Sequence, residues 1–313
     1  MLIPKLCFVI PCYNEEDIFS YTLNCVSDLM LELIESQIIS TSSYILFVDD
    51  GSRDRTWELI LEASKDNFLV KGIKLASNVG HQKALFAGLS YIDGDISVTL
   101  DADLQDDIYI IKSMLESYRQ GIDVVFGVRS SRDSDRWLKK TSARLFYKLI
   151  SFLRIHHIEN HADFRLMSRK VTSALLEHRE SNLYLRGLIR QIGFSSSVVK
   201  YVRNERSLGK SKYSFKKMIS LALDAITSHS IVPLRVITCL GLVISFFSFI
   251  AGINSLYIKF TGEAIDGWTS LITSIYFLGG VQLMSLGVIG EYVGRTYIES
   301  KKRPGFFIDK ETG

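Results

Sequence analysis

The sequence has few cysteines and no large excess of charge of either sign. Its four cysteines (Cys7, Cys12, Cys25 and Cys239) show neither paired nor ligand-like spacing, so neither a disulfide framework nor a zinc site is expected. The 37 basic and 34 acidic residues leave a net charge of only +3, and no nucleic acid partner is expected. The apolar run before Pro11 is too short for the core of a signal peptide, so the first part of the chain is expected to stay in the cytosol.

Long apolar runs are also missing from most of the chain, and they gather near its end. Hydrophobic residues make up 47% of the sequence, but the segment from Ile231 to Tyr292 is far more apolar than what precedes it. A chain of 313 residues can hold one sizeable domain and a smaller part. The predicted division is a cytosolic domain over 1–205, a basic loop and interfacial helix over 206–230, a membrane part over 231–292 and a cytosolic tail over 293–313.

The first part alternates between short apolar runs and helical stretches. The apolar runs are Leu6–Ile10, Tyr44–Val48, Val70–Leu75, Ile96–Leu100 and Val124–Gly127, and the helical stretches include Ile18–Ile34, Thr56–Ser64, Lys83–Tyr91 and Ile108–Arg119. This alternation predicts an α/β fold with a mainly parallel sheet and helices on both faces. Ligands of such sheets bind outside the carboxyl ends of the strands.

An acidic stretch follows the fourth predicted strand. In an extended chain alternate residues face the same way, so Asp101, Asp103 and Gln105 would present three oxygen ligands to one side. Oxygen ligands next to open space suit Mg²⁺ or Mn²⁺, which keep coordination sites for water and phosphates. The alternative is a solvated acidic turn that caps the helix starting near Ile108.

Polar loops follow the other predicted strands as well. Glu15 and Asp50 offer carboxylates that can accept hydrogen bonds from a nucleobase edge or ribose hydroxyls. Gly51 permits a tight turn, and Ser52 or Asp54 can cap the next helix. Gly80, Ala84 and Gly88 are spaced four apart, which predicts a helix that packs closely on the sheet; His81 is assigned no role.

The order of these motifs resembles the family 2 glycosyltransferases of the GT-A fold. The motifs are Pro11-x-Tyr-Asn-Glu15, Asp49-Asp-Gly-Ser52, Asn78-x-Gly80, Asp101-Ala-Asp-Leu-Gln105, Asp163-Phe-Arg-Leu-Met-Ser-Arg169, Gly209-Lys-Ser-Lys-Tyr213 and Gly287-Val-Ile-Gly-Glu-Tyr-Val-Gly-Arg295. Together they cover nearly the whole chain. They are most similar to the polyprenyl-phosphate branch, which includes dolichol-phosphate mannosyltransferases and bactoprenol-phosphate glucosyltransferases.

The resemblance implies roles for individual residues. Asp101 would face the phosphates of a nucleotide sugar, and Asp103 with Gln105, next to Asp101, would hold the divalent metal. The remaining implied contacts are Pro11, Tyr13, Asn14, Glu15 and Asp50 for the donor, and Arg165 for a substrate. Asp163 would be the catalytic carboxylate near the anomeric carbon. A phosphate acceptor is already anionic, so Asp163 could instead orient that acceptor or stabilise a cationic sugar centre.

Two basic segments could meet a phosphate or a membrane. Arg136, Lys140, Arg144 and Lys148 form one stripe on a predicted helix over 138–154, which is either a solvated face or a contact to acceptor phosphate or membrane. Arg129 and Arg144 are the expected acceptor contacts. A second basic cluster lies between Arg203 and Lys217, where the resemblance implies a loop that closes over the phosphates through Arg206, Ser211 and Lys212.

Two uncharged stretches, 236–258 and 268–290, are each long enough to cross a hydrocarbon core of about 30 Å. Basic residues flank both outer ends, so the positive-inside rule predicts cytosolic termini and an external hairpin loop. Glycines in the second stretch fit close helix contacts, within the hairpin or between protomers of a homo-oligomer.

The expected protein is an inverting glycosyltransferase of a bacterial inner membrane. Its lipid bilayer partner would carry the acceptor, a polyprenyl phosphate, and glucose from UDP-glucose is the first choice of donor for undecaprenyl phosphate. The alternatives are a GDP-mannose-dependent mannosyltransferase and a non-catalytic membrane scaffold. A processive polysaccharide synthase is not expected, because Asp133 stands where the Gln-x-x-Arg-Trp motif of that group needs glutamine.

Overall fold

The computed structural model describes residues 3–129, 161–178, 185–202 and 267–312, with short stretches between 234 and 253. The chain forms two compact units. The first contains the amino-terminal part of the chain and residues 302–313, and the second contains 213–301.

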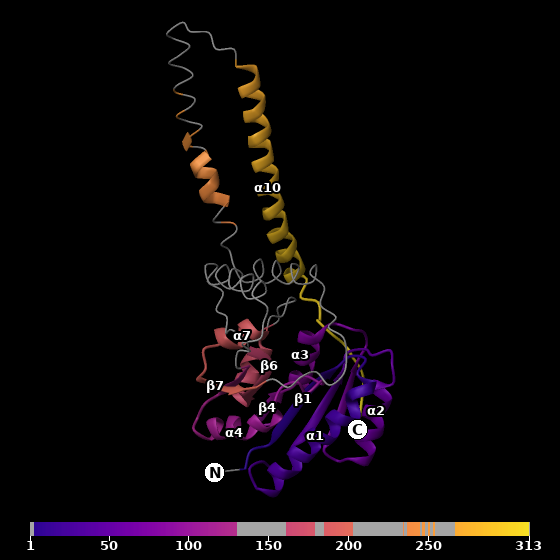
Figure 1. Cartoon of the computed structure of the whole chain (residues 1–313). Coiled ribbons are helices and arrows are strands. Elements are labelled where there is room, and N and C mark those ends of the chain that lie inside the picture. The colour runs from indigo at the N-terminus through magenta and orange to yellow at the C-terminus, as the bar shows by residue number, and fades with distance from the viewer. Residues whose placement is uncertain are drawn as a thin grey trace. The chain divides into compact units, whose positions relative to one another are not determined.

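One mixed sheet forms the centre of the first unit (Figure 1). Its strands are β1 (Leu6–Cys12), β2 (Tyr44–Asp49), β3 (Val70–Leu75), β4 (Ile96–Thr99), β5 (Val124–Arg129), β6 (His161–Ser168), β7 (Ser196–Tyr201) and β8 (Ile308–Glu311). Their order is β7-β5-β6-β4-β1-β2-β3-β8. β6 runs antiparallel to β4 and β5, β8 runs antiparallel to β3, and the other neighbours are parallel. The predicted α/β fold is confirmed, with two antiparallel strands in a mainly parallel sheet.

Helices cover both faces of this sheet. The helices are α1 (Glu16–Glu35), α2 (Thr56–Asp66), α3 (His81–Tyr91), α4 (Ile111–Arg119), α6 (Arg169–Leu176) and α7 (Leu185–Gln191). Side chains of α1, α2 and α4 share one buried apolar cluster with Phe8, and those of α3, α6 and α7 share another with Val9. Successive residues of a strand point to opposite faces, so a continuously apolar strand serves both clusters.

The small residues of α3 pack as predicted at two of three positions. Ala84 is fully buried. A Cβ on Gly88 would clash with the side chain of Val9 and lie 2.8 Å from Val48 Cγ2, so only glycine lets the helix come this close to β1 and β2. The prediction is wrong for Gly80, where a Cβ would meet nothing. Gly80 instead precedes the helix with φ of 92°, a backbone conformation that favours glycine.

The carboxyl terminus returns to the sheet as strand β8, which the sequence did not predict. β8 pairs with β3, and Thr312 Oγ1 accepts a hydrogen bond of 2.8 Å from the Gly72 amide. The Phe307 carbonyl accepts another, of 2.9 Å, from the Ala76 amide. Residues 302–312 therefore belong to the same folded unit as the amino-terminal strands.

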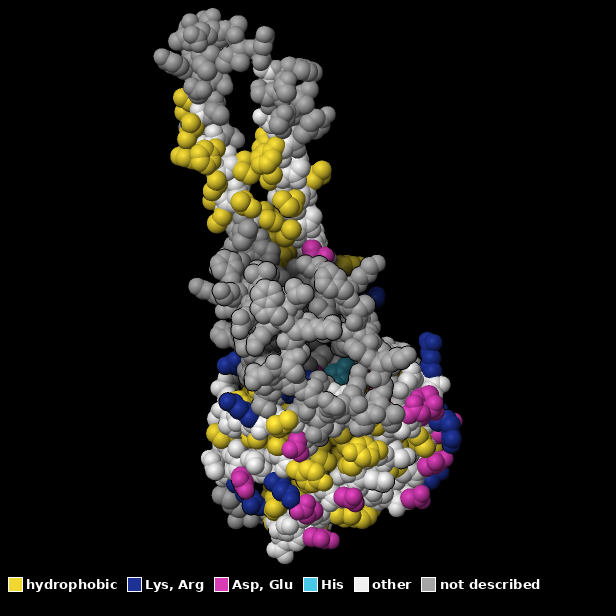
Figure 2. Space-filling view, viewed as in Figure 1, with side chains coloured by type: hydrophobic (Ala, Val, Ile, Leu, Met, Phe, Trp, Pro, Cys, Tyr) yellow, Lys and Arg dark blue, Asp and Glu magenta, His cyan; other side chains and the backbone are white. Residues whose placement is uncertain are grey.

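The second unit contains the long helix α10 (Trp268–Ser300). Judged by length and composition, its segment Phe277–Ser300 is the one helix of the described residues that could cross a membrane. Figure 2 shows hydrophobic side chains along this unit. Leu283 and Leu286 of α10 are among the exposed ones. The second predicted span, 268–290, lies within α10. Of the first, 236–258, the structure describes only short helical stretches between 237 and 253, so the two-helix hairpin remains a prediction.

Candidate active site

The polar loops predicted to form the site meet at one edge of the sheet. β1, β2, β3, β4 and β5 are mutually parallel in direction, so the loops that follow them emerge on the same side. β6 is antiparallel to β4, with Arg165 opposite Thr99, so Asp163 near the start of β6 also reaches this edge. The insertion of β6 thus brings Asp163 beside the loop that begins at Asp101.

The loops after β1 and β2 are joined by hydrogen bonds. Asn14, with φ of 53°, donates its amide to Ser52 Oγ (3.0 Å) and accepts from the Arg53 amide (2.9 Å). The Glu15 amide donates to Thr56 Oγ1 at 3.0 Å. These contacts hold the expected donor-binding segment in place, with Pro11 buried in β1 and Tyr13 exposed.

Of the two predicted caps for α2, Asp54 acts at the start of the helix and Ser52 does not. Asp54 Oδ1 accepts from the Thr56 amide at 3.1 Å, whereas Ser52 Oγ is used by the neighbouring loop.

Asp50 organises the loop after β3. Its carboxylate is buried and accepts hydrogen bonds from the amides of Val79 (2.8 Å) and Gly80 (3.0 Å) and from Asn78 Nδ2 (3.0 Å). Burial raises the pKa of Asp50, and the two amide donors oppose that rise. Gly51 has φ of 67°, and a Cβ there would lie 2.7 Å from the Asn78 nitrogen. The tight turn predicted at Gly51 is confirmed.

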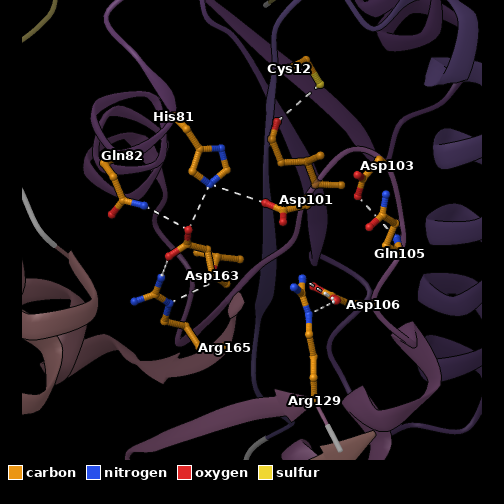
Figure 3. Close-up of polar contacts among 12 residues, drawn as sticks. Cys12, His81, Gln82, Asp101, Asp103, Gln105, Asp106, Arg129, Asp163 and Arg165 are labelled. Carbon is orange, nitrogen blue, oxygen red and sulfur yellow. Dashed lines mark hydrogen bonds and ion pairs between the residues drawn. The ribbon is translucent and has the colours of Figure 1, made fainter. Parts of the chain in front are cut away.

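The acidic stretch after β4 is a turn, so the predicted extended chain is wrong. β4 ends at Thr99, the Leu104 amide donates to the Asp101 carbonyl at 3.3 Å, and Leu104 has φ of 42°. A turn removes the alternation of side chains that an extended strand would give. Asp101 consequently contacts His81, whereas Asp103 Oδ1 accepts from the amide of the buried Gln105 at 3.4 Å (Figure 3).

The helix predicted at Ile108 begins with a short 3-10 turn, η1 (Ile108–Ile110), that leads into α4. The Asp107 side chain accepts from the Tyr109 amide at 3.0 Å, so this part of the acidic stretch does cap the helical segment. The capping alternative therefore applies to Asp107, at the end of the stretch.

Two carboxylates, one from the loop after β4 and one from β6, converge on His81 (Figure 3). His81 Nε2 lies 3.4 Å from Asp101 Oδ1 and 3.3 Å from Asp163 Oδ2. Gln82 Nε2 donates to the same Asp163 oxygen at 3.0 Å, and the guanidinium of Arg165 pairs with the other oxygen. Arg165 is only 1% exposed, so in this structure it supports Asp163 and does not line the surface where a substrate would bind.

The environment of Asp101 disfavours its charged form. Burial raises the pKa of Asp101 although 34% of its side chain remains exposed; His81 lowers this pKa, and the carboxylates of Asp163, Asp106 and Asp103 raise it further. Positively charged or hydrogen-bond-donating groups are therefore needed to keep these carboxylates together.

A second ion pair, between Arg129 and Asp106, lies directly after the acidic turn. Arg129 donates from Nε (3.1 Å) and Nη2 (3.0 Å) to Oδ1 of Asp106, which is 5% exposed, and lies 3.3 Å from the Tyr201 hydroxyl. Burial lowers the pKa of Arg129, but Asp106 and Tyr201 outweigh this and raise it overall. Arg129 thus already binds the protein's own carboxylate, and its contact to an acceptor phosphate remains a prediction.

Comparison with known proteins identifies the family. The sequence profile of glycosyl transferase family 2 matches residues 7–176. The chain belongs to glycosyl transferase family 2. The glycosyltransferase YkoT of Bacillus subtilis is 49% identical over 98% of this chain and 91% of its own length. The bactoprenol glucosyl transferase of Shigella phage SfV is 40% identical over 98% of this chain and 99% of its own length.

A solved structure of glucosyl-3-phosphoglycerate synthase from Mycobacterium tuberculosis, in complex with Mn²⁺, UDP and glucosyl-3-phosphoglycerate, is also similar. The match covers 72% of this chain and 78% of that one, with 16% identity and a TM-score of 0.46. The resemblance stated from the sequence motifs is confirmed by the family match, and the protein is a glycosyltransferase.

Several residues expected in this glycosyltransferase site lie outside the described residues. They are Arg144, Arg206, Ser211 and Lys212, together with the basic helix over 138–154. Conversely, sequence reasoning missed His81, Gln82 and Asp106. The available signal for the first two was their position directly after Asn78-x-Gly80, where a helix begins at the edge of the sheet that carries ligands.

Proposed function

We propose that this family 2 glycosyltransferase moves glucose from UDP-glucose onto undecaprenyl phosphate, with inversion at the anomeric carbon. The convergence of Asp101 and Asp163 at the edge where the strand loops meet is the observation that carries the proposal. The choice of donor and acceptor draws on relatives named bactoprenol glucosyl transferases, which match this chain along nearly its whole length.

The reaction needs one displacement. An oxygen of the acceptor phosphate attacks the anomeric carbon, and the bond from that carbon to the diphosphate breaks, so the electron pair leaves with UDP. The acceptor oxygen is already anionic, and Asp163 need not remove a proton from it. Asp163, held by Arg165 and Gln82, instead orients the acceptor or stabilises positive charge on the sugar.

We also propose that the acidic turn holds Mg²⁺ or Mn²⁺ through Asp103 and Gln105, next to Asp101. The described residues contain no group of three His, Cys, Asp or Glu side chains placed to hold a metal ion. Although the turn ends the strand-like alternation, Asp101, Asp103 and Gln105 would supply two carboxylates and one amide, which are oxygen ligands of the kind that these ions prefer. When bound, the ion would neutralise negative charge on the departing diphosphate.

The return of β8 to the sheet supports two membrane crossings. Since β8 pairs with β3, the carboxyl terminus and the amino-terminal strands lie on the same side of any membrane that the chain crosses. A chain that leaves and returns to one side crosses an even number of times. If α10 is one crossing, another must precede it, and 236–258 is the uncharged stretch long enough to do so. The basic residues that flank the two uncharged stretches favour the cytosolic side, so we propose cytosolic termini in a bacterial inner membrane.

The activity is tested with full-length protein in detergent, undecaprenyl phosphate and a panel of labelled nucleotide sugars that includes UDP-glucose and GDP-mannose. We expect a lipid-linked product from UDP-glucose, none with undecaprenol lacking the phosphate, and none with Asp163→Asn. Product from GDP-mannose alone would overturn the donor assignment. No product with any donor would overturn the enzymatic proposal, and full activity of Asp103→Ala in the presence of a chelator would overturn the metal.

The topology is tested with single cysteines in a variant that lacks the native ones. A membrane-impermeant maleimide should label Glu263→Cys, in the predicted external loop, in intact cells. Lys310→Cys, in β8, should be labelled only after the cells are opened. Labelling of both in intact cells would contradict the proposed orientation.

A further inference from the structure

His81 occupies the first position of α3 and carries its ring to the carboxylates of the site. Its Nε2 lies 3.3 Å from one oxygen of Asp163 and 3.4 Å from one of Asp101. Carboxylate oxygens accept hydrogen bonds, and an N–H at Nε2 is the group of the imidazole ring that can donate to both of them.

The two carboxylates reach His81 from elements that are far apart in the sequence. Asp101 follows β4, while Asp163 lies in β6. Two carboxylates that both lie within 3.4 Å of one atom repel each other when both are charged. A hydrogen-bond donor between them, such as the His81 ring, offsets this repulsion. Arg165 contacts one oxygen of Asp163, and Gln82 and His81 contact the other. Both oxygens of this carboxylate are therefore fixed by neighbouring side chains.

The backbone that carries His81 is itself held in place. The amide of Gly80, the preceding residue, donates to the buried Asp50 at 3.0 Å. Gly80 has φ of 92°, which turns the chain into the helix. The start of α3 is therefore fixed to the loop that follows β2, and the imidazole projects from a fixed point.

We propose that His81 is a positioning residue for sugar transfer. It fixes the position of the Asp163 carboxylate, on the acceptor side, relative to the Asp101 carboxylate, which faces the donor phosphates. The inference rests on the proposed function. Because the His81 side chain is 42% exposed, it contributes little to the core, and its replacement should alter catalysis far more than folding.

The test compares His81→Ala and His81→Gln with a matched control, His178→Ala, in the lipid-linked product assay. His178 lies after α6, and its ring contacts the Ala174 carbonyl rather than the site. A misplacement of about 1 Å can cost about 100-fold in rate, so we expect His81→Ala to lower kcat by about that factor. KM for the donor and the Tm should stay near the wild-type values. Glutamine carries an N–H donor at a similar distance from the backbone. The kcat of His81→Gln should therefore be at least about tenfold higher than that of His81→Ala.

The outcomes separate this inference from the proposed function. An active wild type with inactive Asp163→Asn, but with His81→Ala within about threefold of the wild-type kcat, would overturn the positioning role alone. The positioning role is also overturned if His81→Gln is no better than His81→Ala, or if the loss of rate is matched by a lower Tm. A wild type that yields no product would overturn the proposed function itself, and the role of His81 with it.

Discussion

Removing the guanidinium of Arg129 is expected to destabilise the protein through the carboxylate it leaves behind. Asp106 is 5% exposed, and two nitrogens of Arg129 donate to its Oδ1 at 3.0 and 3.1 Å. In Arg129→Met the apolar stem is kept, but the charge of Asp106 loses its partner in a place that water reaches poorly. Because Asp106 follows the acidic turn directly, that turn should also lose its anchor to β5.

Breaking a buried pair from one side costs about 3–5 kcal/mol, and the lower value applies here because the Arg129 side chain is 27% exposed. For a domain of this size, about 3 kcal/mol corresponds to a fall in Tm of roughly 6–12 °C. The double variant Asp106→Asn/Arg129→Met removes both charges. It should therefore be more stable than the sum of the single changes predicts, by at least about 1 kcal/mol.

Thermal unfolding of the full-length protein in detergent, followed by circular dichroism, measures these differences. Arg119→Met is the matched control, because Arg119 is exposed at the end of α4 and its loss should change stability by less than about 0.5 kcal/mol. The reasoning is refuted if Arg129→Met unfolds within about 1 °C of the wild type, or if the changes at positions 106 and 129 are additive.

Three further predictions concern other parts of the same domain. Gly88→Ala would push a Cβ into Val9 and should lower the free energy of unfolding by about 1–3 kcal/mol. Thermal unfolding measures this against the control Gly294→Ala, where a Cβ meets nothing and no such loss is expected. Truncation after Pro304 removes β8 and exposes the edge of β3, so size-exclusion chromatography should show more aggregate. Asp50→Asn loses acceptor capacity for the loop after β3 and should raise the donor KM about tenfold, and an unchanged KM would contradict its organising role.

Local patterns were enough to predict the main elements of the domain. Buried strands such as Leu6–Cys12 read as continuous apolar runs because helices cover both faces of the sheet. Their alternation with helices indicated a parallel arrangement, and the rule that ligands meet the carboxyl ends of strands indicated the edge where Asp50 and Asp101 lie. Four of the motifs that carry the family resemblance, those that begin at Pro11, Asp49, Asn78 and Asp101, lie at or after the ends of these strands.

The geometry of the site depended on contacts that no local pattern reports. The extended-chain expectation failed at Leu104, whose positive φ belongs to a turn, and with it failed the inference that alternate side chains share a side. β8 was not predicted because it is four residues long and exposed, so it lacks the apolar periodicity by which strands are found. Its place in the sheet is decided by pairing with β3.

The amino-acid sequence by itself determined the fold class and the edge of the sheet that carries the chemistry, because these follow from hydrophobic periodicity and from residue types at strand ends. It determined the family through the resemblance of its motifs. Only the tertiary structure decided which of those residues touch. The antiparallel insertion of β6 beside β4 brings Asp163 to Asp101, and the close packing of α3 on β1 and β2 sets His81 between them. Such contacts arise from strand order and helix packing, which join residues far apart along the chain.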